Sequence, residues 1–239
     1  MLERILVFKD TKALCEAMAA DFWGMSLTQG VKHIALSGGS TPMMLFEVLA
    51  NEFNDKIDWS KFHFWWGDER CVPPDNDESN YKLAKEYLLD HIDIPKKNIH
   101  RIHGEAIPEK EAQRYGQEMF RHLPPLDGWP SFNLLLLGMG EDGHTASIFP
   151  NQMDLLNSKD FCAVANHPVT GQKRVTITGQ VLNHARAVYF MITGASKAET
   201  LMKIISQNTG YMSYPAARVH AVNGSLNWWL DEEAASMIQ

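Results

Sequence analysis

Short apolar runs alternate along the chain with longer stretches in which apolar side chains recur at helical spacing. The runs predict strands at 33–37, 62–66, 132–137, 174–178 and 187–193. The longer stretches predict helices at 11–25, 43–49, 81–90, 108–122 and from about 198 to 205. Apolar strands that are separated by helices favour an α/β fold, with a doubly wound and mostly parallel sheet of Rossmann-like type.

The alternation continues without an internal repeat or a Gly/Ser-rich linker, so we expect one α/β domain over residues 1–239. Hydrophobic residues make up 45% and charged residues 21% of the chain. Those values are typical of a globular protein with a full core, and they exclude a disordered or collagen-like chain. The longest apolar run is far shorter than the roughly 18–20 residues that a membrane span needs, so no membrane partner is expected.

The formal net charge of −7 argues against nucleic acid as the main partner, because phosphate backbones need a basic surface. Cys15, Cys71 and Cys162 are scattered and have no CxxC spacing, which favours a reducing compartment over a disulfide scaffold or a structural zinc site. The first residues do not resemble a signal peptide, so we expect a cytoplasmic protein. The sequence leaves a monomer and a small homo-oligomer open.

Polar loops follow four of the predicted strands. In open α/β sheets, ligands bind beyond the carboxyl ends of the strands. We therefore expect one crevice for a small-molecule substrate, to which four loops contribute: 37–42, 67–70, 138–144 and 194–197.

The loop at 37–42 has the character of an anion cradle. Glycines let a backbone approach a ligand closely, and a helix start offers unpaired N–H groups and a favourable dipole. We expect Thr41 to cap the helix and Pro42 to take its first position. The loop matches neither a Walker loop, a GxGxxG turn nor a GxSxG serine elbow, and a plain tight turn is the alternative. The expected cradle consists of Gly38, Gly39, Ser40 and Thr41.

Lys197 follows a strand and a glycine at the start of a helix. A cation there opposes the helix dipole, and a bound anion would remove that cost. We therefore include Lys197 in the substrate site, with an exposed surface lysine as the alternative.

Asp142-Gly143-His144 is the sharpest local feature of the sequence. Histidine is the side chain best suited to transfer protons near neutral pH, and Asp142 could orient the imidazole. A structural histidine beside a loop aspartate is the alternative. A metal site would have Asp68, Glu69, Asp142 and His144 as ligands, but no recognised ligand spacing is present and we expect no metal.

Asp68-Glu69-Arg70 places two acids and an arginine after the second predicted strand. Arginine can bind phosphate or carboxylate with two hydrogen bonds and can stabilise an oxyanion. We therefore place Asp68 and Arg70 in the site, with an internal ion pair as the alternative.

Together these segments resemble the 6-phosphogluconolactonases of the glucosamine/galactosamine-6-phosphate isomerase superfamily. The most specific segment is Leu-Gly-Met-Gly-Glu-Asp-Gly-His-Thr-Ala-Ser-Ile-Phe-Pro at 137–150. The other matching segments, in order and with the family's spacing, are 36–42, 67–73, 79–81, 174–178, 194–198, 215–217 and 229–235.

The resemblance implies a fold similar to glucosamine-6-phosphate deaminase and ribose-5-phosphate isomerase. It implies hydrolysis of 6-phospho-D-glucono-1,5-lactone to 6-phospho-D-gluconate, in the oxidative pentose phosphate pathway, without a metal or organic cofactor. His144 matches the family's general base, and Arg70 and Arg174 match positions that contact the substrate. The phosphate would lie where related enzymes hold it, at Ser40, Thr41 and Lys197.

Two other functions stay open as alternatives. A glucosamine-6-phosphate deaminase continues its Asp-Gly-His into Asn-Glu-Pro, whereas Ile148, Phe149 and Pro150 follow at this position here. That family also has a tyrosine after its Asp-Glu, where this chain has Arg70. A non-catalytic sugar-phosphate sensor would keep the anion cradle and tolerate loss of the base, but His144 is intact.

Overall fold

The central sheet has six parallel strands in the order β1-β11-β10-β7-β2-β3. The computed structural model describes residues 2–238. This arrangement confirms the predicted α/β fold with its mostly parallel sheet. The strands are β1 (Leu2–Phe8), β2 (Lys32–Leu36), β3 (Phe62–Trp66), β7 (Leu134–Leu137), β10 (Ala187–Ile192) and β11 (Ser225–Asp231).

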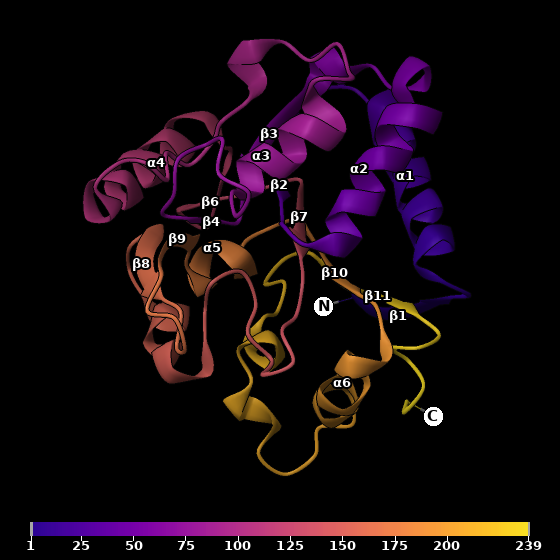
Figure 1. Ribbon diagram of the computed structural model, residues 1–239, viewed down its shortest axis with the longest axis vertical. Coiled ribbons are helices and arrows are strands. Elements are labelled where there is room, and N and C mark those ends of the chain that lie inside the picture. The colour runs from indigo at the N-terminus through magenta and orange to yellow at the C-terminus, as the bar shows by residue number, and fades with distance from the viewer. Residues whose placement is uncertain (1, 239) are drawn as a thin grey trace.

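Helices cover this sheet on both sides. Figure 1 shows α1 and α2 side by side on one side of the strands β10, β11 and β1, and α6 on the other. In α1 the predicted apolar stripe of Leu14, Met18 and Phe22 is fully buried. The α-helices are α1 (Thr11–Leu27), α2 (Ser40–Glu52), α3 (Asn80–Ala84), α4 (Pro108–His122), α5 (Gly179–Asn183) and α6 (Ala198–Ile205).

A smaller antiparallel sheet lies beside the central one, in the order β4-β9-β8. It holds the segment predicted as a strand at 174–178, which pairs outside the parallel sheet. It also includes β4, which lies in a stretch predicted as a loop. The strands are β4 (Asp68–Arg70), β8 (Cys162–Asn166) and β9 (Lys173–Ile177), and a separate short hairpin joins β5 (Pro125–Leu126) to β6 (Trp129–Pro130).

The remaining helical segments are short 3₁₀ turns and one π-helical turn. The helix predicted at 81–90 is α-helical only to Ala84 and continues as a π-helical turn at Lys85–Leu89. Among residues 2–238, no helix is both long and apolar enough to cross a membrane. The 3₁₀ turns are Asn54–Lys56, Trp59–Lys61, Lys96–Asn98, Pro150–Asn157, Ala195–Lys197, Tyr211–Ser213 and Pro215–Arg218.

The chain leaves the neighbouring strands β2 and β7 in opposite directions. From β2 it proceeds to the edge strand β3, and from β7 it reaches β10 on the other side. Ligands of open α/β sheets bind at such a switch point, because the two loops diverge and leave a crevice between them. The topology therefore predicts the ligand site at the carboxyl ends of β2 and β7.

Candidate active site

A cavity of about 220 Å³ lies at this switch point. The loops after β2, β7 and β10 all reach it, and the small antiparallel sheet supplies one wall. The predicted convergence of polar strand ends is thus what the structure shows. The lining residues are Ser37, Gly38, Asp68, Arg70, Asn80, Gly138, Met139, Gly140, His144, Ala146, Arg174 and Lys197.

Asp142 and His144 form a hydrogen-bonded pair at one wall of the cavity. Asp142 Oδ1 lies 2.6 Å from His144 Nδ1 and also accepts the backbone N–H of His144 at 3.1 Å. Burial alone would raise the pKa of Asp142. The hydrogen bonds from His144 lower this pKa by more than burial raises it, so the net shift is downward. The His144 side chain is 28% exposed. With Asp142 accepting at Nδ1, Nε2 is the ring nitrogen left for a substrate or water.

The loop that carries this pair is fixed from several sides. Gly140 N donates to His144 O, and Thr200 on α6 donates to Glu141 O at 2.7 Å. At Gly140 there is no room for a side chain, because a Cβ would lie 2.1 Å from His144 Nδ1. Gly143 has a φ of +75°, and a Cβ there would meet the Tyr214 ring at 2.5 Å. The glycines of this loop therefore allow the imidazole to lie against the backbone.

Arg70 and Arg174 lie directly opposite each other on β4 and β9. The buried Nε atoms of both have no hydrogen-bond partner among the described residues. Burial and the neighbouring Arg70 charge lower the pKa of Arg174. Arg70 donates to the main-chain carbonyl of Glu78 at 2.7 Å, so this contact differs from the internal ion pair weighed as an alternative. Two adjacent guanidinium groups with unused donors indicate an anionic ligand.

A buried carboxylate fixes the backbone of this wall. Glu69 accepts the backbone N–H groups of Arg70, Asn80 and Tyr81, each at 2.8 Å, and the hydroxyl of Ser79 at 3.0 Å. Burial raises the pKa of Glu69, and the four hydrogen bonds lower it only partly. Glu69 therefore ties β4 to the first turn of α3.

That connection brings Asn80 to the cavity, although no role was predicted for it from the sequence. Asn80 Nδ2 donates to the main-chain oxygen of Asp68 at 2.9 Å. Its Oδ1 lies so near Gly38 that a Cβ on the glycine would be 1.9 Å away. Asp68 is buried, and its Oδ2 accepts the hydroxyl of Ser147 at 2.5 Å. Asp68 and Asn80 thus join the loops after β2 and β3.

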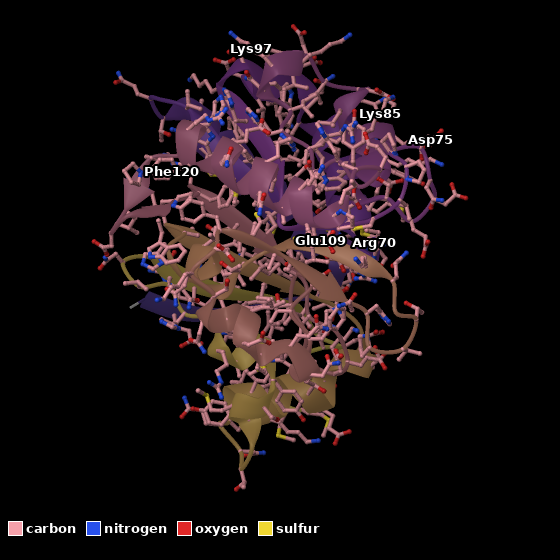
Figure 2. All side chains as sticks on the ribbon, turned by 90° about the vertical axis from the view of Figure 1, so that its left-hand side faces the viewer. Arg70, Asp75, Lys85, Lys97, Glu109 and Phe120 are labelled. Carbon is pink, nitrogen blue, oxygen red and sulfur yellow. The ribbon has the colours of Figure 1, made fainter. Side chains whose placement is uncertain are left out.

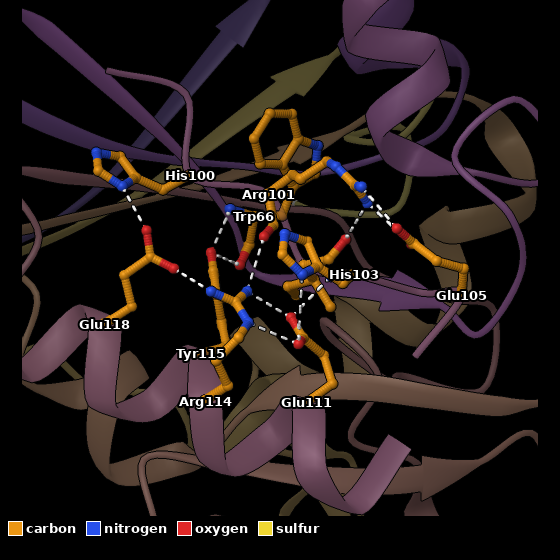
Figure 3. Close-up of polar contacts among 10 residues, drawn as sticks. Trp66, His100, Arg101, His103, Glu105, Glu111, Arg114, Tyr115 and Glu118 are labelled. Carbon is orange, nitrogen blue, oxygen red and sulfur yellow. Dashed lines mark hydrogen bonds and ion pairs between the residues drawn. The ribbon is translucent and has the colours of Figure 1, made fainter. Parts of the chain in front are cut away.

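A network of charged side chains joins α4 to the segment at 100–105 (Figure 3). Glu111 is only 2% exposed and accepts Arg114 Nε and the backbone N–H of His103, each at 2.7 Å. The segment then passes so close to β4 that a Cβ on Gly104 would lie 2.4 Å from Arg70 O. Figure 2 shows Arg70 where the N-terminal and C-terminal parts of the chain meet.

The turn after β2 contributes less side-chain chemistry than we expected. Ser37 and Gly38 line the cavity, whereas Gly39, Ser40 and Thr41 do not. The Thr41 hydroxyl is 2.6 Å from the Thr193 hydroxyl. Predicting Thr41 as the N-cap was wrong, because α2 begins at Ser40 after Gly39, which has a φ of 111°. That places Pro42 at the third helical position and not the first.

Lys197 reaches the cavity from the turn after β10, directly before α6. The buried carboxylate of Asp231 holds this turn, accepting the N–H of Gly194 at 3.0 Å and the hydroxyl of Thr11 at 3.1 Å. The predicted position of Lys197 at a helix start is confirmed.

Among residues 2–238, no cluster of three or more His, Cys, Asp or Glu side chains could hold a metal ion. Cys71, which follows Arg70, is half-buried, and its burial raises the pKa of the thiol to about 11. A thiol with a raised pKa is a poor nucleophile at neutral pH.

Comparison with known proteins supports the resemblance seen in the sequence. The family model for glucosamine-6-phosphate isomerases/6-phosphogluconolactonase matches residues 9–228. A 6-phosphogluconolactonase from Aggregatibacter actinomycetemcomitans is 40% identical over 234 residues, covering 98% of this chain and 99% of the relative. The crystal structure of a devB protein covers 100% of both chains with a TM-score of 0.96 and 43% identity.

The 6-phosphogluconolactonase from Trypanosoma brucei superposes with a TM-score of 0.86 at 29% identity, covering 99% of both chains. This agreement extends over nearly the whole chain, including every loop that lines the cavity. The chain therefore belongs to the glucosamine-6-phosphate isomerase/6-phosphogluconolactonase family, and within it to the 6-phosphogluconolactonases, which are hydrolases.

Proposed function

We propose that the protein hydrolyses 6-phospho-D-glucono-1,5-lactone to 6-phospho-D-gluconate, with His144 as the general base that activates water. The observation that carries this proposal is the Asp142–His144 pair, with Oδ1 and Nδ1 2.6 Å apart, at a cavity with two arginines whose Nε atoms have no partner in the described part of the chain. The pair supplies a base, and the arginines supply charge for an anionic substrate.

The chemistry needs no covalent nucleophile, because a lactone carbonyl is already electrophilic. His144 takes a proton from a water molecule as that water attacks the carbonyl carbon, and the C–O ring bond then breaks. The proton on the imidazole passes to the ring oxygen, which leaves as a hydroxyl. Asp142 holds the imidazole by Nδ1 throughout, so Nε2 faces the water.

Cations around the cavity divide the remaining work. Arg70 stabilises the oxyanion that forms at the carbonyl oxygen, and Arg174 contacts the substrate beside it. The phosphate, which carries about −1.5 to −2 charges at neutral pH, lies at the turn around Gly38 and at Lys197. The cavity thus attracts an anion although the protein's net charge is −7.

The neighbouring residues favour this reaction over deamination. In a deaminase of this family, the histidine is supported by the glutamate of an Asn-Glu-Pro stretch, whose place Ile148, Phe149 and Pro150 take in this chain. Here Phe149 lies against the imidazole, with its ring centroid 4.8 Å from that of His144. This position of the chain therefore lacks the carboxylate that a glucosamine-6-phosphate deaminase would use.

The test is hydrolysis of freshly prepared 6-phosphogluconolactone, followed with a spontaneous-hydrolysis blank because the lactone decays unaided. We expect strong turnover by the wild-type protein and a drop of about 100-fold or more in His144→Ala. The exposed His220 lies outside the cavity, so His220→Ala serves as the matched control and should retain wild-type turnover.

Other outcomes separate the alternatives. Full turnover in His144→Ala would support lactone hydrolysis and refute the role of His144 as the general base. Absence of wild-type turnover would refute the lactonase. In that case, release of ammonia from glucosamine 6-phosphate would identify a deaminase, and phosphosugar binding without turnover would identify a sensor.

A further inference from the structure

Phe149 contacts two of the residues assigned to the reaction without lining the cavity itself. Its ring centroid lies 4.8 Å from that of the His144 imidazole, with the planes tilted by 43°. The guanidinium carbon of Arg174 lies 5.7 Å from the same centroid. Phe149 is 1% exposed, so its ring is shielded from water. Both distances are within the roughly 6 Å at which an aromatic face attracts a cation.

The turn between His144 and Phe149 is held too firmly for the ring to move freely. Thr145 and Ile148 exchange two backbone hydrogen bonds, at 3.3 and 2.9 Å. Between them Ala146 has a φ of 47°, a left-handed conformation that non-glycine residues rarely adopt. Ser147 points inward and donates to the buried Asp68. The strained turn therefore sets the place of the ring behind the imidazole.

The charges around His144 explain why such a contact matters. Three fixed cations face the cavity that His144 lines, and the imidazole of His167 on the β8–β9 turn is close enough to sense the same charges. The facing carboxylates are Asp142, which contacts the imidazole, and Asp68, which is bonded to Ser147 and Asn80. The cations are Arg70 on β4, Arg174 on β9 and Lys197 after β10.

A general base in this position becomes a cation among cations. The arginines and the lysine carry the same sign of charge as the imidazolium that the proposed reaction forms. Asp142 compensates on one edge of the imidazole. On the surface of the imidazole, the contact that the described residues offer is the tilted ring of Phe149, whose π-system can attract a cation.

We propose that Phe149 is a positioning residue that holds the His144 imidazole in place and stabilises its protonated form through a cation–π contact. This inference rests on the proposed function in one respect, namely that His144 takes up a proton during the reaction. It assigns to Phe149 the task that a carboxylate performs in the related deaminases, with a neutral ring that adds no negative charge to a site for an anionic substrate.

The first experiment compares Phe149→Leu with wild type in two measurements. One is the pH dependence of kcat/KM for the lactone, and the other is an NMR titration of the His144 imidazole, assigned by its loss in His144→Gln. Loss of a cation–π contact should move the acidic midpoint of both to lower pH by about half to one unit. We also expect kcat to fall several-fold, while KM stays near wild type because Phe149 does not line the cavity.

The matched control is Phe132→Leu. Phe132 is also fully buried, but it packs on Trp65 away from the cavity, so it reports the general cost of the substitution. We expect this variant to lose stability without moving either midpoint. A purely structural role of Phe149 would produce the same pattern in Phe149→Leu, and that result would overturn the proposal.

A graded series keeps the test decisive if Phe149→Leu does not fold. Replacing Phe149 by mono-, di- and trifluorophenylalanine removes negative charge from the ring face with little change of size. We expect the His144 midpoint to fall stepwise along the series, and a constant midpoint would refute the contact. The NMR titration does not depend on turnover. A constant midpoint would therefore refute the Phe149 contact even if the protein hydrolyses the lactone, and a stepwise fall would support the contact even if it does not.

Discussion

Substitution of Gly140 by alanine should disable the base while leaving the fold intact. The φ of Gly140 is outside the left-handed region, so an alanine backbone fits there without strain. Its Cβ, however, would lie 2.1 Å from Nδ1 and 2.3 Å from Cε1 of His144, and 2.6 Å from Oδ1 of Asp142. An ordinary contact is at least 3.4 Å, so the imidazole must retreat by more than 1 Å.

The size of the effect follows from how far a general base can reach. Proton transfer needs heavy atoms about 2.6–3.2 Å apart, and a misplacement of about 1 Å can cost about 100-fold in rate. We therefore expect kcat to fall about 100-fold in Gly140→Ala, equivalent to about 2.7 kcal/mol of transition-state stabilisation. The loss of unfolding free energy should stay below about 1 kcal/mol, because the partly exposed His144 side chain can rotate away.

The assay is lactone hydrolysis over the blank, with urea unfolding on the same samples. Gly24→Ala is the control, since Gly24 is exposed in α1 with no atom within 4 Å of its Cβ position. Combined with His144→Ala, the Gly140→Ala change should cost nothing further, because both act through one imidazole. A folded Gly140→Ala that keeps more than about a third of wild-type kcat would refute this reasoning.

Two further predictions concern stability. Burial, and next the neighbouring histidines, lower the pKa of His33 and His63 to about 4, so both are neutral in the folded protein and protonated in the unfolded chain between pH 4 and 6.5. These two histidines should therefore leave the unfolding free energy unchanged near neutral pH and lower it below pH 6.5 by up to about 1.4 kcal/mol per pH unit each, and urea titrations that stay flat to pH 4.5 would contradict this. Glu69→Gln replaces one acceptor oxygen by a donor, so we expect the free energy of unfolding in urea to fall by about 2–4 kcal/mol and kcat/KM to fall at least tenfold. Glu233 is exposed, so Glu233→Gln is the control and should match wild type in both measurements.

The central part of the fold could be predicted from the sequence because its signals are local. The four consecutive leucines of β7 are all buried, and the helix at 108–122 has the predicted bounds. The edge strand β1 and its neighbour β11 were not predicted. Glu3 and Arg4 interrupt the apolar pattern of β1, and its place depends on pairing with β11, which follows more than 200 residues later. Pairing at that distance leaves no trace in local periodicity.

The site residues likewise divide into those that the sequence predicts and those that depend on tertiary contacts. The positions of His144 and Lys197 at the cavity, and of Asp142 beside His144, could be predicted, because each lies in a loop that follows a strand and the fold class brings strand ends together. Asn80 could not, because a buried carboxylate from another segment carries it there. The Thr41 hydroxyl, expected at the phosphate, is hydrogen-bonded to the hydroxyl of Thr193, which directly follows β10 and is a neighbour that only the tertiary structure supplies.

The small antiparallel sheet explains how one parallel fold acquires a site for this kind of anion. Among residues 2–238, loops after parallel strands supply His144, the glycine turn and Lys197, but the two arginines of the cavity come from the antiparallel sheet. Pairing of β4 with β9 places them side by side, since opposite residues of an antiparallel pair lie on the same face. The pairing sets two positive charges side by side, and their buried Nε atoms have no hydrogen-bond partner within residues 2–238, an arrangement that is unfavourable without an anion nearby. If the proposed anionic substrate binds here, it would supply acceptors for these donors, so the free energy lost by leaving them unpaired would be recovered on binding.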